Sequence, residues 1–274
     1  MKYASHLKKI FKDTRLYVED LLLLESFQIK DMVIRAPQKE FATLLRAHPI
    51  IHQFLIHKEP SVEKTLSKLL KINNPINDPK AIDDHCNEVM WEVGELIIYN
   101  KFPEVYDSKI HFNWKLQEII SPELLKNKTV ADAGAGPGVL CFLLSPYCNA
   151  VYAIEPLSSF RNYMRKRIQK NSTNNIFPME GFLDAIPLPR HSVDILFTSN
   201  ALGWNFEKEQ QEIERVVKPG GQAIHLMRAF DQDAESPHHT KLLDYNYHFQ
   251  KLPDKGFKAR YAKTFQKTFC AKKD

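Results

Sequence analysis

The sequence predicts an α/β fold in which an α-helical N-terminal segment precedes a doubly wound parallel sheet that ends in an antiparallel hairpin. Through the first ~110 residues, apolar side chains recur at helical spacing. From His111 onward, short apolar runs alternate with helical patterns, which is typical of parallel strands joined by crossover helices. Near the end of the chain, two extended runs have almost nothing between them, and so short a link permits only an antiparallel pair.

Composition and charge are those of a globular protein. The chain has 274 residues, of which 43% are hydrophobic and 26% charged, so it can hold one large domain or two small ones. No segment approaches the ~20 apolar residues that span a bilayer, and the N-terminus lacks a signal-peptide core. We therefore predict a cytoplasmic protein with no membrane partner. No C-x-x-C pair is present, and free thiols are expected at Cys86, Cys141, Cys148 and Cys270.

The N-terminal segment, residues 1–110, is expected to be helical throughout. Glycine is absent before Gly94, so little in this segment requires an unusual backbone. Asp78 followed by Pro79 is a strong helix start, because a side-chain cap precedes a proline whose missing N–H would be unpaired anyway. This helix is predicted to run to about Asn100. No metal site is predicted, because the histidines here do not form an H-E-x-x-H pattern.

The second part, residues 111–274, is expected to form the sheet and its helices. Helices are predicted at Trp114–Ile120 and at about His238–Tyr247, besides the helix that follows the first strand. Five parallel strands are predicted at Thr129–Ala133, Ala150–Ile154, Ile176–Glu180, Val193–Ser199 and Gln222–Met227. The two runs of the antiparallel hairpin are Phe257–Thr264 and Gln266–Ala271.

A glycine-rich loop between the first strand and the next helix is the strongest functional signal. It reads V-A-D-A-G-A-G-P-G over residues 130–138. Glycines let the backbone turn sharply and approach a ligand, and the helix N-terminus adds free N–H groups. A dinucleotide fingerprint G-x-G-x-x-G counted from Gly134 would need glycine where this chain has Val139. A phosphate-binding loop would need G-K-[ST], which is absent.

The D-x-G-x-G-x-G pattern of this loop resembles motif I of the class I S-adenosylmethionine (SAM) dependent methyltransferases. The resemblance implies a Rossmann-like methyltransferase sheet and SAM as cofactor, held by Asp132, Ala133, Gly134, Ala135, Gly136 and Gly138. The next strand ends in Glu155-Pro156. An acid at this place can accept both ribose hydroxyls, a device that NAD-binding folds share.

Three further elements follow in the order that the family has. Residues 180–189 resemble the stretch G-D-A-E-x-L-P, which places Phe182 and Leu183 at the adenine. The family often has Asp where this chain has Phe182, so the hydrogen bond to the adenine amino group falls to Asp184 or to a backbone carbonyl. Residues 198–204 resemble the end of the fourth strand, which adds Asn200 and Ala201 to the cofactor site. Residues 214–221 resemble the R-V-L-K-P-G-G turn before the fifth strand.

The resemblance implies direct displacement of the SAM methyl group by a nucleophile, for which alignment of the reacting atoms is the protein's main contribution. A side-chain base is needed only if the acceptor must first lose a proton. Candidate bases are His111 and His225, the latter at the end of the fifth strand; both also fit structural roles. Trp204 is a candidate for cation–π contact with the sulfonium or the substrate, or for packing.

A small-molecule acceptor is favoured. The fourth strand ends in S-N-A-L rather than the [DN]-P-P-[YF] of enzymes that methylate nucleobase amines, and the Pro-Cys nucleophile of C5-cytosine enzymes is missing. Residues 1–110 are predicted to act as a lid over the carboxyl ends of the strands, the alternative being a dimerisation module.

Two other functions remain open on the sequence. The first is an RNA or protein methyltransferase that docks through a basic C-terminal tail, since residues 251–274 hold eight lysines and arginines against Asp254 and Asp274; nucleic acid is a possible but not a favoured partner. The second is a non-catalytic SAM-binding protein whose helical segment is an interaction module.

Overall fold

The computed structural model describes residues 11–109, 112–229, 238–252 and 257–266. The chain divides into two compact units, Met1–Ile110 and His111–Asp274. No helix within the described ranges has the length and hydrophobicity needed to cross a membrane. Cys86, Cys141 and Cys148 are free thiols, as predicted, and Cys270 lies outside the described residues.

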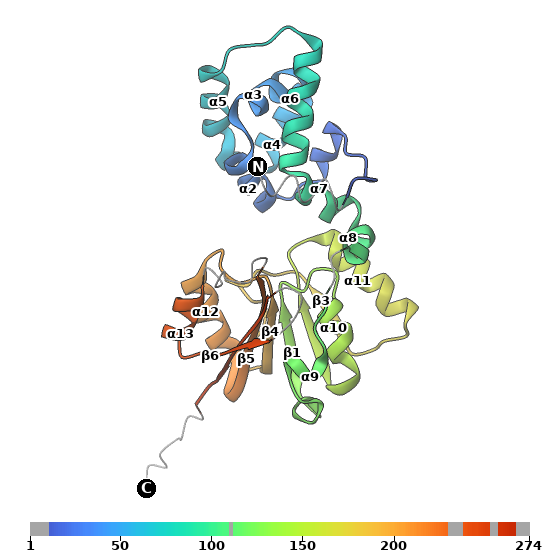
Figure 1. Ribbon diagram of the computed structural model, residues 1–274, viewed down its shortest axis with the longest axis vertical. Coiled ribbons are helices and arrows are strands. Elements are labelled where there is room, and N and C mark those ends of the chain that lie inside the picture. Colours follow the sequence, from blue (N-terminus) through green and yellow to red (C-terminus); the bar gives the residue numbers. More distant parts are fainter. Residues whose placement is uncertain (1–10, 110–111, 230–237, 253–256, 267–274) are drawn as a thin grey trace. The chain divides into compact units, whose positions relative to one another are not determined.

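The first unit is helical, as predicted (Figure 1). The larger of the two buried clusters among its described residues extends from Leu21 to Ile97, and a smaller one contains Phe11 and Ile98. Helix α3 packs along α6. The elements are η1 (Val18–Leu23), α2 (Ser26–Arg35), α3 (Gln38–Ala47), α4 (Pro49–Lys58), η2 (Pro60–Val62), α5 (Glu63–Ile72), α6 (Pro79–Glu92), α7 (Gly94–Lys101) and α8 (Pro103–Lys109).

The long helix predicted after Asp78 is two helices. Asp78 caps α6 as predicted, with its side chain accepting a hydrogen bond from the Lys80 N–H. The helix ends at Glu92, however, with Val93 as its C-cap, and α7 starts at Gly94, so the prediction of one helix to Asn100 was wrong. A Cβ atom at Gly94 would lie 3.1 Å from Leu16 Cδ1. The absence of a side chain therefore lets Leu16 pack against the junction between the two helices.

The second unit is a seven-stranded sheet in the order β3-β2-β1-β4-β5-β7-β6. Its first five strands are parallel, and β7 runs antiparallel between β5 and β6. The strands are β1 (Thr129–Ala133), β2 (Ala150–Ile154), β3 (Ile176–Met179), β4 (Val193–Ser199), β5 (Val217–Ala229), β6 (His248–Leu252) and β7 (Phe257–Thr264). The doubly wound α/β fold is therefore as predicted.

Helices cover both faces of this sheet (Figure 1). The α12 and α13 side chains Ile213 and Leu242 belong to one buried cluster, and the α10 and α11 side chains Leu140 and Met164 belong to another. Strand residues alternate between these clusters as period-2 geometry requires. The helices of this unit are α9 (Leu116–Ile119), η3 (Pro122–Leu125), α10 (Val139–Leu144), η4 (Ser145–Tyr147), α11 (Ser158–Lys170), α12 (Phe206–Val216) and α13 (His239–Asp244).

The C-terminal hairpin differs from its prediction. Phe257–Thr264 is a strand as expected, and within the described residues it pairs with β5 on one edge and with β6 on the other. The predicted second strand, Gln266–Ala271, lies outside the described residues apart from Gln266, so it stays a prediction. Strand β6 escaped prediction because its exposed and half-buried residues give no apolar alternation.

Other boundaries move by a few residues. The helix predicted at Trp114–Ile120 is the single turn α9, and the one predicted at about His238–Tyr247 is the shorter α13. Strand β5 is longer than predicted, because it begins at Val217 and continues to Ala229. Strand β3 ends one residue early, at Met179.

Candidate functional site

The loop between β1 and α10 bends through three glycines in the left-handed region. Their φ angles are +77° at Gly134, +54° at Gly136 and +86° at Gly138. A Cβ atom at Gly134 would lie 2.2 Å from the Cβ of Ala201, and one at Gly138 would lie 2.7 Å from Met164 Sδ. At Gly136 nothing lies within 4 Å of that position. Gly134 and Gly138 are therefore required by packing, whereas Gly136 faces open space.

The acid that follows β2 is joined to this loop. Glu155 is buried, and its carboxylate accepts hydrogen bonds from the Gly136 N–H at 2.8 Å and from the Leu157 N–H at 2.9 Å. Burial raises the pKa of Glu155 to about 7, against the opposing effects of these hydrogen bonds and of Arg161. The predicted ribose-binding acid and the glycine loop thus lie together.

Asp132, at the end of β1, is the second buried acid. Cys141 Sγ donates to Asp132 Oδ2 at 3.2 Å, while Oδ1 has no hydrogen-bond partner among the described residues. Burial is the main cause that raises the pKa of Asp132 to about 7, and the nearby charge of Glu155 also raises it. An unpartnered buried oxygen is costly, so this atom is suited to a polar group that enters the site.

The segment after β3 carries the predicted adenine residues. Phe182 is about a third exposed (36%), and Leu183 is buried. The backbones of Phe182 and Ala185 form an isolated antiparallel β-bridge. Asp184 Oδ2 accepts a hydrogen bond from Asn205 Nδ2 at 3.1 Å. The segments after β3 and after β4 are therefore connected.

The loop after β4 is held from several sides. Ala201 packs against Gly134 as described, and Asn200 has a φ of +53°. The buried carboxylate of Glu209 on α12 accepts from three consecutive backbone N–H groups at 2.7, 2.9 and 3.0 Å, those of Gly203, Trp204 and Asn205. Trp204 is 75% exposed. A well-held loop thus presents a large aromatic side chain at the carboxyl end of the sheet.

Of the two histidines proposed as bases, the structure describes only His225. His111 lies outside the described residues. His225 lies inside β5 rather than at its end, because the strand continues to Ala229. Its imidazole is fully buried, shares a 2.8 Å hydrogen bond with Thr198 Oγ1 and contacts the Tyr247 ring. Burial lowers the pKa of His225 to about 3, so the ring is neutral at pH 7.

Sequence reasoning missed two residues that organise the site, Glu209 and Arg161. Glu209 holds the loop after β4, as above. Arg161, buried on α11, donates to the backbone carbonyl oxygens of Glu155 and Pro156. Both belong to charged helical segments that look like solvated faces in sequence, and neither lies in a recognisable motif.

Residues 131–225 match the profile of a family described as "Methyltransferase domain". The matched range runs from β1 to β5 and contains the glycine loop, Glu155 and the loop after β4. Residues 131–225 therefore form a methyltransferase domain. SAM is therefore its cofactor and the protein is an enzyme.

Two solved structures show the extent of structural similarity to this methyltransferase. A SAM-dependent methyltransferase from Aquifex aeolicus is 21% identical, with 60% of this chain and 98% of that chain covered and a TM-score of 0.47. A SAM-dependent methyltransferase from Mesorhizobium loti is 13% identical, with 53% and 93% covered and a TM-score of 0.43.

The residues at the carboxyl ends of β1 and β2 fit SAM. Gly136 leaves open space at the bend of the loop, where a side chain would stand in the way of a ligand. The buried Asp132 Oδ1 lacks a partner among the described residues, and the carboxylate of Glu155 adjoins the same loop. Backbone donors, space and acids together match a ligand with an amino-acid end and a ribose.

Proposed function

We propose that the protein transfers the SAM methyl group to an O, N, S or C nucleophile of a small-molecule acceptor. The observation that carries the proposal is the short connection from β4 to α12, where S-N-A-L leads into the loop that presents Trp204. This connection has neither the di-proline of nucleobase enzymes nor an inserted subdomain.

For the cofactor we propose specific contacts within the second unit. The loop from Asp132 to Gly138 holds the methionine end, and Glu155 holds the ribose. Phe182 and Leu183 pack on the adenine, whose amino group is bound by Asp184 or by a backbone carbonyl. The arrangement around Gly136 supports these assignments, as does the contact between Gly134 and Ala201.

The chain's own contribution is positioning and exclusion of water. When bound, SAM supplies a methyl group on a sulfonium, which is already an activated leaving group. Loops pinned by Glu209 and by the Gly134–Ala201 contact are suited to hold an acceptor in a defined orientation. Trp204 offers an exposed aromatic face to that acceptor. We assign no side-chain base, since His225 is buried and neutral.

Acceptor contacts beyond these loops are proposed to come from the helical unit, residues 1–110, acting as a lid. The proposal follows from the short connections at the carboxyl edge of the sheet, which leave few side chains for recognition. Deletion of residues 1–100 is expected to abolish turnover on the true acceptor. Unchanged turnover would reject the lid.

The acceptor class is tested by labelling. Purified protein is incubated with SAM carrying a tritiated methyl group and with a cell extract separated into low-mass, RNA and protein fractions. We expect the label to enter the low-mass fraction. Label in RNA or protein, with an affinity that falls steeply as salt rises, would overturn the small-molecule assignment for a macromolecular one. SAM binding without transfer to any fraction would indicate a non-catalytic role.

A further inference from the structure

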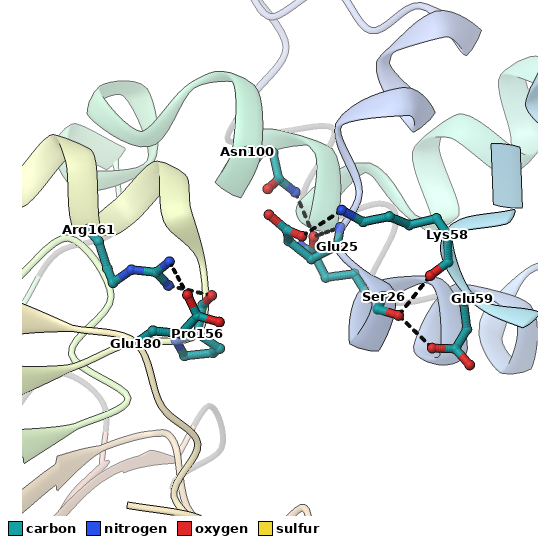
Figure 2. Close-up of polar contacts among 9 residues, drawn as sticks. Glu25, Ser26, Lys58, Glu59, Asn100, Pro156, Arg161 and Glu180 are labelled. Atoms are coloured by element: carbon teal, nitrogen blue, oxygen red, sulfur yellow. Dashed lines mark hydrogen bonds and ion pairs between the residues drawn. The ribbon is translucent and has the colours of Figure 1, made fainter. Parts of the chain in front are cut away.

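One buried arginine joins two of the segments proposed to hold the cofactor. Arg161 lies in the first turn of α11 and is 8% exposed. Its Nη1 donates to the carbonyl oxygen of Glu155 at 2.8 Å and to that of Pro156 at 2.6 Å. Its Nη2 donates to Glu180 Oε2 at 2.7 Å. Figure 2 shows the guanidinium directed at Pro156 and Glu180.

The hydrogen bonds of Arg161 reach both the segment proposed to bind the ribose and the segment proposed to bind the adenine. The Glu155–Pro156 turn follows β2, and Glu180 precedes Gly181 and the adenine residue Phe182. The planar guanidinium donates to the two adjacent carbonyls and to the carboxylate from two nitrogens held in a rigid fork, whereas lysine would place its three donors on one nitrogen at the end of a flexible chain. The side chain therefore sets the spacing between the two segments.

The same cation acts on the Glu155 carboxylate electrostatically. Arg161 lowers the pKa of Glu155, as do the N–H groups of Leu157 and Gly136, while burial is the larger effect and raises it to about 7. On β1, the carboxyl of Asp132 is the other ionisable group coupled to Glu155. Glu180 faces Arg161 from the segment after β3.

We infer that Arg161 is a positioning residue for SAM binding, which orients the turn that carries Glu155 and fixes that turn against the adenine segment. This inference rests on the proposed role of Glu155 as the ribose-binding acid. It also explains why a basic helix buries one of its arginines while the other charged residues of α11 are at least partly exposed.

The test is calorimetric titration of the full-length protein with SAM between pH 5.5 and 8.5. We expect Arg161→Gln to weaken binding about tenfold or more at pH 7, the effect of losing a charge-assisted hydrogen bond. Because Glu155 then ionises at higher pH, the midpoint of the affinity–pH curve is expected to move upward. Arg161→Lys should lose affinity but keep its midpoint near that of the wild type.

Arg165→Gln is the matched control. This residue lies one turn further along α11, is exposed, and donates to Asn162 Oδ1 at 3.0 Å and to the Pro178 carbonyl oxygen at 3.4 Å. We expect its SAM affinity to stay within about twofold of the wild type. An Arg161→Gln protein that is folded and binds SAM within twofold of the wild type would overturn the inference. Equal losses in Arg161→Gln and Arg161→Lys, without a shift in midpoint, would also overturn it and indicate packing alone.

A second variant keeps the inference testable if Arg161→Gln does not fold. Glu180 has a 72% exposed side chain, so Glu180→Gln is expected to fold and to weaken SAM binding about threefold. Wild-type affinity in Glu180→Gln would then count against the inference. Wild-type affinity in Glu155→Gln is a separate outcome, which would reject the proposed role of Glu155 itself.

Discussion

The three glycines of the loop after β1 have different physical origins. Gly134 and Gly138 are enforced by Ala201 and Met164, which would meet any added side chain. A Cβ atom at Gly136 would have no atom within 4 Å, so the glycine there is explained by its positive φ and by the space it leaves open. Substitutions at the three positions should therefore separate ligand binding from folding.

Gly136→Ala is expected to weaken SAM binding at least tenfold while the fold persists. The backbone cost of alanine at positive φ is about 1–2 kcal/mol, and the added methyl group would occupy the space proposed for the ligand. Calorimetry with SAM measures the first effect, and chemical denaturation without SAM measures the second.

Gly134→Ala is the matched control for this substitution. Its methyl group would lie 2.2 Å from the Cβ of Ala201, so we expect a loss of stability larger than that of Gly136→Ala. If Gly136→Ala binds SAM as the wild type does, the loop does not hold the ligand in the way proposed.

At this scale the sequence predicted where the glycine loop and the acid after β2 lie, but not the packing that surrounds each glycine. The spacing D-x-G-x-G-x-G placed the loop, and the acid after β2 was located correctly beside it. The packing partners Ala201 and Met164 are far from the loop in sequence, so no local pattern reports them. The sequence also could not show that Asp132 Oδ1 is buried without a hydrogen-bond partner among the described residues, because burial is a property of the folded chain.

His225 should make the protein sensitive to acid. Its pKa is about 3 when folded and 6.5 in the unfolded reference state. The unfolded chain therefore binds a proton as pH falls below 6.5, while the folded chain does not, and the free energy of unfolding declines from pH 6.5 towards pH 3. We expect His225→Leu to make this decline shallower, as measured by urea unfolding at several pH values.

Absolute stability at pH 8 should fall in His225→Leu by about 1–3 kcal/mol, because the Thr198 hydroxyl loses its partner. His248 on β6 is exposed, and His248→Gln should leave the pH dependence of unfolding unchanged. A decline as steep in His225→Leu as in the wild type would show that another group titrates instead.

At the scale of elements, three central strands were predicted to the residue, whereas the edge strand β6 was not predicted. Strands β1, β2 and β4 coincide with the predicted ranges because their apolar runs are continuous and end at turn residues. Strand β6 is mostly exposed, so its pairing with β7 depends on backbone hydrogen bonds that leave no apolar pattern. The break at Val93 was also not predicted, and the contact of Leu16 with Gly94 at this junction joins residues far apart in sequence.

Glu209 connects helix α12 to the loop that precedes it. Its carboxylate accepts three backbone N–H groups from Gly203–Asn205. We expect Glu209→Ala to lower the free energy of unfolding by about 3 kcal/mol, because these N–H groups lose a charged acceptor. Hydrogen exchange should also accelerate at residues 203–205.

The control for this change is Glu207→Ala, two residues earlier on α12. Glu207 pairs with Lys241 at the surface, and such pairs contribute little to stability. Its unfolding and loop exchange should match the wild type. Protected amides at residues 203–205 in Glu209→Ala would mean that other contacts hold the loop.

At the scale of the whole molecule, each of the two units has its own core. The cluster from Leu21 to Ile97 belongs to the first unit, and the two clusters on the faces of the sheet belong to the second. The cofactor residues proposed here all lie in residues 132–201, within the second unit. Cofactor binding and stability of the helical unit should therefore be separable.

Saturating SAM should stabilise only the part of the protein that contains the sheet. A ligand that binds the folded state raises stability by mass action, by about 2.7 kcal/mol at a hundredfold excess over Kd. We expect hydrogen exchange under mild denaturant to slow in residues 129–226 upon addition of SAM and to remain unchanged in residues 21–97. Equal slowing in both ranges would mean that the two units unfold as one cooperative body, and that the helical unit responds to the cofactor before any acceptor is present.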